Sequence, residues 1–115
     1  MTNSLDAQDA GNDLLHALVG VFPAELGVSA GRMFNGQGLK AGGKFFAFVS
    51  STGRLVVKLP EREVQNLVED GDAAPVTMGK RTMREWVSLP QPQDGDPACW
   101  RAALEASRMF VVTHG

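Results

Sequence analysis

The first hydrophobic positions of the chain follow a helical period. From about Ser4 to Phe22, apolar residues recur mostly three or four positions apart, which places them on one face of an amphipathic helix. Pro23 lacks the N–H group that a continuing helix would use, so the helix is predicted to end just before it. This segment is therefore predicted to lay its apolar face on a core.

Between Arg32 and Leu59 the hydrophobic period shortens to two, which is typical of strands. The apolar residues that alternate, as a half-buried antiparallel sheet requires, are Phe46, Phe48, Leu55 and Val57. Glycines separate the runs and supply positions where positive φ is cheap. The segment is therefore predicted to form a three-stranded antiparallel meander.

The second half of the chain returns to helices around two short strands. Pro60 suits the first turn of a helix and Gly71 suits its end. Residues 74–78 and 85–89 are candidate strands, and Pro97 opens a third helix. The order of a helix, a meander, a helix, two strands and a helix predicts a two-layer α+β fold, an antiparallel sheet covered by helices.

Composition places the chain among globular proteins. It has 115 residues, of which 43% are hydrophobic and 21% are charged. We therefore expect a single folded domain over residues 1–115. Eleven basic residues against 13 acidic ones give a net charge of -2, which weighs against a domain whose main task is to neutralise a phosphate backbone.

Cysteine and histidine usage excludes several kinds of site. The single cysteine, Cys99, has no partner for an intramolecular disulfide, which favours a reducing compartment. His16 and His114 lie far apart, so no close-spaced cluster indicates a metal site. The chain starts without a basic targeting segment, and the apolar stretch 14–22 is short of a spanning length. We expect a cytoplasmic protein with no membrane contact, no metal and no cofactor.

Three segments together resemble the N-terminal domain of the TfoX/Sxy family of competence regulators. They are Arg-Met-Phe-Asn-Gly-Gln-Gly-Leu at 32–39, Gly-Lys-Phe-Phe-Ala-Phe-Val at 43–49 with Arg-Leu-Val-Val-Lys at 54–58, and Met-Arg-Glu-Trp-Val at 83–87. Each segment alone is weak evidence for the family, but the order and spacing of the three segments make the resemblance specific. The family commonly has a second glycine at the position of Asn35 and proline at that of Thr82.

The resemblance implies a two-layer α+β domain, similar to secretion-chaperone-like folds, and a role in regulation. Full-length regulators of this kind carry a second, helical domain and act with the cyclic-AMP receptor protein on competence promoters. At 115 residues, the chain matches the N-terminal type of domain alone. The resemblance carries no catalytic residue set, so we expect a stand-alone, non-enzymatic regulatory or adaptor domain that binds another protein.

One basic patch stands out as a candidate interaction surface. Its members are Lys80, Arg81, Arg84 and Trp86. On a regular strand, Arg84 and Trp86 would share one face, so a nucleic-acid base could stack on the tryptophan while the cations meet phosphate. The alternative is that Trp86 is a core or interface anchor and the cations form a solvated edge. Nucleic-acid binding is therefore an alternative to the protein partner, and a small-molecule sensor is a third. A homodimer is compatible with each.

The remaining candidates are expected to be structural. The glycines between 36 and 43 fit turns better than a phosphate loop, because no helix N-terminus follows them. His16 is expected to be partly buried, and Cys99 to be a small packing residue rather than a nucleophile. The apolar tail 109–112 either extends the third helix into the core or forms a strand that pairs with another subunit.

Overall fold

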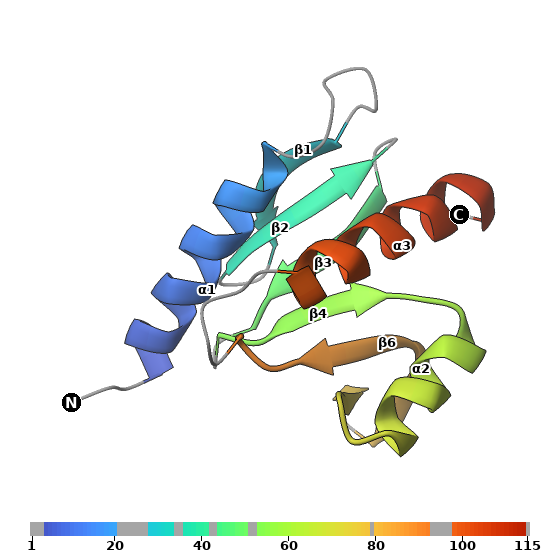
Figure 1. The fold of residues 1–115 in the computed structure, drawn as a ribbon. Helices are drawn as coiled ribbons and strands as arrows, with labels where there is room; N and C mark the ends of the chain where they lie inside the picture. The colour runs from blue at the N-terminus through green and yellow to red at the C-terminus, as the bar shows by residue number, and fades with distance from the viewer. Residues whose placement is uncertain are drawn as a thin grey trace.

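Nine elements make up the fold in the computed structural model, which describes residues 4–20, 28–33, 36–41, 44–50, 53–78, 80–92 and 98–114. In chain order they are α1 (Ser4–Val19), β1 (Val28–Met33), β2 (Gly36–Ala41), β3 (Lys44–Val49), β4 (Leu55–Lys58), α2 (Glu61–Glu69), β5 (Ala74–Met78), β6 (Arg81–Leu89) and α3 (Ala98–His114). The strands form one six-stranded sheet in the order β1-β2-β3-β4-β6-β5, and every neighbouring pair is antiparallel. The predicted two-layer α+β fold is confirmed (Figure 1).

The strand register separates the two faces of the sheet. Ala47, Val57 and Val87 are cross-strand partners on β3, β4 and β6, and all three are fully buried. They belong to one core cluster with side chains from all three helices, namely Leu15, Leu18, Val64, Trp100, Leu104 and Val111. The helices therefore cover the same face, and Figure 1 shows α1 and α3 crossing it. We call this the helix face, and its opposite the open face.

A register shift in the β2–β3 pair sorts the phenylalanines of β3. Leu39 pairs with Ala47 but Lys40 pairs with Phe45, so Phe46 is the extra residue of a bulge. Phe46 is fully buried, whereas Phe45 and Phe48 are half-buried. The expectation that Phe46 and Phe48 occupy one face of a regular strand is therefore wrong, because the bulge turns Phe46 toward the helices.

The meander has one strand more than predicted. Gly36 and Gly38, expected at turns, lie within β2, where Gly38 pairs with Gly31 and Phe48. Whether a segment forms a strand depends on its neighbours in the sheet. Here β1 pairs with β2 along its whole length, and β3 pairs with residues 38–41. Residues 42 and 43, from the same glycine-rich stretch, lie outside the described part of the chain.

Close contacts hold the helices on the sheet. A Cβ added to Gly11 of α1 would lie 2.9 Å from the carbonyl oxygen of Gly53 and 2.9 Å from Val49 Cγ1. The Ser107 hydroxyl of α3 donates to the Phe46 carbonyl at 2.9 Å. Trp100 Nε1 donates to the Pro90 carbonyl at 2.8 Å. The Ser107 hydroxyl and the Trp100 indole N–H are thus hydrogen-bonded, as their desolvation requires.

The helix ends mostly follow the predicted signals. α2 begins directly after Pro60, ends at Glu69, and is followed by Gly71 with φ of 79°. The tail 109–112 continues α3, with Val111 buried in the core and Met109 and Val112 exposed. Of the two predictions for the tail, helix extension is confirmed. In the described ranges, no helix has the length and apolar character needed to cross a membrane.

Candidate functional site

The candidate surface lies where β6 extends past the end of β4. β4 pairs with β6 only from Leu55–Leu89 to Lys58–Trp86, and the Leu59 N–H then donates to the Glu85 carbonyl at 2.9 Å. Arg81, Thr82 and Met83 pair with β5 on one side. On the side that faces β4, no described residue pairs with residues 81–84. Backbone N–H and C=O groups on a strand alternate between its two sides. This short stretch of β6 is therefore an open strand edge.

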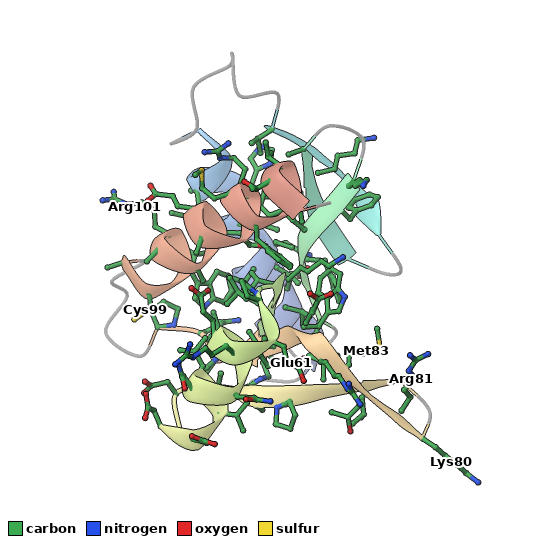
Figure 2. The ribbon with its side chains drawn as sticks, turned by 90° about the vertical axis from the view of Figure 1, so that its right-hand side faces the viewer. Glu61, Lys80, Arg81, Met83, Cys99 and Arg101 are labelled. Carbon is green, nitrogen blue, oxygen red and sulfur yellow. The ribbon has the colours of Figure 1, made fainter. Side chains whose placement is uncertain are left out.

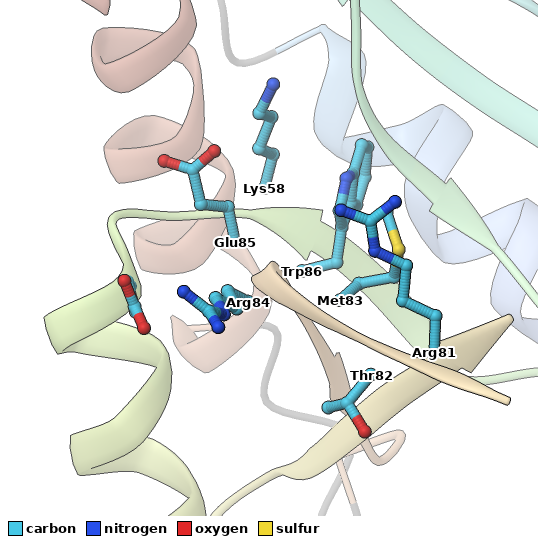
Figure 3. Close-up of a pocket in the computed structure, with 8 residues that line it drawn as sticks. Lys58, Arg81, Thr82, Met83, Arg84, Glu85 and Trp86 are labelled. Carbon is cyan, nitrogen blue, oxygen red and sulfur yellow. The ribbon is translucent and has the colours of Figure 1, made fainter.

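A groove of about 590 Å³ runs along this edge (Figure 3). It is lined by Lys58 at the end of β4, Glu61 at the start of α2, and six consecutive residues of β6, Arg81, Thr82, Met83, Arg84, Glu85 and Trp86. Three of the four predicted surface residues, Arg81, Arg84 and Trp86, thus meet in one groove. Lys80 does not line it and projects from the hairpin tip into solvent (Figure 2).

An irregularity in β6 decides which side chains share a side. Val76 of β5 pairs with Met83 while the preceding Pro75 pairs with Val87, so Arg84, Glu85 and Trp86 have no partner on β5. Pro75 has no N–H to give to a regular ladder, which is why the pairing breaks at this step. Figure 3 shows Arg81, Met83 and Trp86 projecting to one side of β6 and Arg84 and Glu85 to the other. The expectation that Arg84 and Trp86 share a face is therefore wrong. The arginine on the same side of β6 as Trp86 is Arg81.

Trp86 is neither a core residue nor a freely exposed one. Its side chain is half-buried, and its ring centroid lies 5.9 Å from that of Phe48, with the ring planes at 52°. Such a tilted aromatic pair contributes to stability and holds both rings in place. Trp86 therefore presents a positioned, partly exposed aromatic surface to the groove.

The charged side chains of the groove have no partner among the described residues. The side chains of Lys58, Arg81 and Arg84 form no hydrogen bond or ion pair there, and neither do the carboxylates of Glu61 and Glu85. Three cations and two carboxylates thus line one groove without forming an ion pair among themselves. Sequence reasoning missed Lys58 and Glu61, since nothing along the chain says that β4 and β6 are neighbours.

A comparison with known families matches this chain to the TfoX N-terminal domain over residues 24–110. The chain belongs to the TfoX N-terminal domain family. A search of curated proteins and a search of solved structures both return no significant match. The matched range contains β1 to β6, α2 and most of α3, and therefore every residue that lines the groove.

Two structural expectations about this TfoX N-terminal domain are wrong. His16 is exposed, because its neighbours Leu15 and Leu18 take the face of α1 that enters the core. Cys99 is also exposed, at the first turn of α3, where the adjacent Trp100 fills the core (Figure 2). Among the described residues, no three His, Cys, Asp or Glu side chains gather in a way that could hold a metal ion.

Proposed function

We propose that this TfoX-like protein is a non-enzymatic regulatory or adaptor domain that binds another protein through the β6 groove. The observation that carries the proposal is the open edge of residues 81–84, which lies beside Trp86 and three cations that have no partner in the described part of the chain. An extended segment of a partner can add to such an edge by main-chain hydrogen bonds, while flanking side chains give specificity. Tryptophan and arginine are also the residues that most often dominate the energy of protein interfaces.

The mixed charge of the groove favours a polypeptide over a nucleic acid at this position. Glu85, which projects to the same side of β6 as Arg84, would repel phosphate groups that approach Arg84. A polypeptide can place basic and acidic side chains opposite charges of both signs, which also selects against wrong partners. The partner segment is thus proposed to be extended, with an acidic residue facing the cations and an apolar residue against Met83 and Trp86.

Family membership supports a place for this interaction in gene regulation. The TfoX N-terminal domain is the family of the competence regulators to which the sequence shows resemblance. We also propose that the protein acts in the cytoplasm, in the control of transcription or competence.

Site-specific photo-crosslinking tests the proposal. A photo-reactive phenylalanine analogue replaces Thr82, which is exposed and lines the groove, in protein expressed at its natural level. We expect one protein to be recovered repeatedly by mass spectrometry. Arg84→Glu should abolish that crosslink, because it reverses a charge in the groove. Arg62→Glu is the matched control, since Arg62 is an exposed residue of α2 outside the groove and the charge change is equal.

Two results would count against the groove as a protein site. One is the absence of any reproducible crosslinked partner at position 82. The other is a partner that Arg84→Glu and Arg62→Glu retain equally, which would place the contact elsewhere on the domain.

A further inference from the structure

The open face of the sheet carries a band of aromatic side chains. Phe45 and Phe48 of β3 and Trp86 of β6 are half-buried, and no described helix packs on this face. Gly31 and Gly38 continue the line of Phe48 on β1 and β2. A Cβ at Gly31 would lie 3.6 Å from the Phe45 ring, so the edge of that ring packs beside the bare glycine backbone. The band therefore offers ring surface to a ligand.

The middle of this face is firmly held. Val56 lies between Phe48 and Ser88 in the register and is buried. Arg54 Nε donates to the Ser88 hydroxyl at 2.7 Å and its Nη2 to the Ser88 carbonyl at 3.1 Å. Phe48 packs against Trp86, so the two rings support each other on this face.

Charge is divided between the two layers of the domain. The six strands contain one acidic residue, Glu85, and six basic ones, Arg32, Lys40, Lys44, Lys58, Arg81 and Arg84. The three helices contain seven acidic residues and three basic ones. The net charge of -2 thus hides a positive sheet and a negative helix layer, and it is the local potential that an approaching ligand meets.

Cations flank the aromatic band on the open face itself. Lys40 pairs with Phe45, and its Nζ lies 5.9 Å from the centre of that ring. Lys58 pairs with Trp86, and Arg81 projects to the Trp86 side of β6 (Figure 3). Glu85, the one acidic residue of the strands, projects to the opposite side. The open face therefore combines flat rings with positive charge along its border.

We propose that the open face binds single-stranded nucleic acid. Bases would stack on Phe45, Phe48 and Trp86, while Lys40, Lys58 and Arg81 contact the phosphates. A second copy of the chain fits poorly, because docking open face to open face would oppose like charges. A duplex also fits poorly, because its bases are already stacked and hidden from the rings. This site shares Lys58, Arg81 and Trp86 with the groove. It goes beyond the proposed protein interaction in its ligand and in its extension over Phe45, Phe48 and Lys40.

Fluorescence anisotropy with a labelled oligothymidylate at low salt tests the site. We expect binding that weakens steeply as salt rises, because each neutralised phosphate releases counterions. Phe45→Leu keeps an apolar side chain but removes the ring, and should weaken binding by about fivefold or more. Lys40→Gln should also lower the slope of log affinity against log salt by about 0.7. Thermal unfolding of each variant checks that the fold is intact.

Lys44→Gln is the matched control. Lys44 lies on β3, which pairs with the strand of Lys40, but it is exposed and pairs with Ala41, whose side chain is in the helix-face core, so binding should be unchanged. Amide shifts on titration should map to β2, β3, β4 and β6 rather than to the helices. Arg84, the residue changed in the groove experiment, projects to the side of β6 opposite Trp86. Arg84→Glu therefore tests the protein site apart from the open face, and the two proposals can fail separately.

Several outcomes would overturn the proposal. Binding that is undetectable even at low ionic strength removes it outright. Equal affinity for a duplex of the same length, or equal competition by polyglutamate, would show a polyanion surface without base stacking. Equal loss of affinity in Lys40→Gln and Lys44→Gln would show that the contact is not confined to the open face.

Discussion

The helix face and the open face of the sheet are built from the same strands, yet their side chains have different tasks. On the helix face, aliphatic residues such as Val57 and Val87 are fully buried under α1, α2 and α3. On the open face, rings and cations alternate with them and remain half-exposed. Strand side chains point alternately to the two faces, so one sequence can encode a core and a binding surface together. Because the helix face supplies the core, the side chains of the open face are available to bind a ligand.

The largest expected contrast between the faces comes from two adjacent phenylalanines. Phe46→Ala removes a fully buried ring from the helix face and should lower the free energy of unfolding by about 3–5 kcal/mol. Phe45→Ala removes a half-exposed ring from the open face and should cost about 1 kcal/mol. Urea unfolding followed by circular dichroism measures both. Similar losses for the two variants would contradict the bulge that separates them.

The same bulge shows where sequence reasoning stops. Period-two alternation predicts the strands and the burial of Leu55 and Val57, because every second residue of a regular strand points to the same face. Phe46 departs from this rule, because the extra residue in β3 places Phe46 and Phe48 on opposite faces although they are two positions apart. The bulge has no mark of its own in the sequence. It follows from the pairing of β2 with β3, which is a property of the folded sheet.

The candidate site was predictable only in part, for the same physical reason. The density of cations around Trp86 marks one strand of the groove along the chain. The other wall is formed by Lys58 and Glu61, because β6 pairs with β4 as well as with β5, the strand that precedes it in sequence. The division of charge between layers is likewise invisible in a total of -2, because it needs each residue to be assigned to a strand or a helix.

A second prediction probes how closely the helix face is packed. Gly11→Ala in α1 improves helix propensity by up to about 1 kcal/mol, which alone would stabilise the protein. The new Cβ would meet the Gly53 carbonyl and Val49 Cγ1 at 2.9 Å, and such overpacking costs about 1–3 kcal/mol. We therefore expect a lower melting temperature. An unchanged or higher one, measured by calorimetry, would mean that α1 does not press on the sheet in this way.

The smallest expected contrast compares two serine hydroxyls, one on each face. Ser107→Ala removes the donor to the Phe46 carbonyl at a fully buried position, and the stranded carbonyl should cost about 1–2 kcal/mol. Ser88→Ala removes an acceptor from Arg54 at a half-exposed position, where the guanidinium keeps its 3.1 Å bond to the Ser88 carbonyl and water can replace the hydroxyl. Its cost should stay within about 0.5 kcal/mol. Chemical denaturation of the two variants side by side measures the difference, and a reversed order would show that solvent does not reach the open face at Ser88.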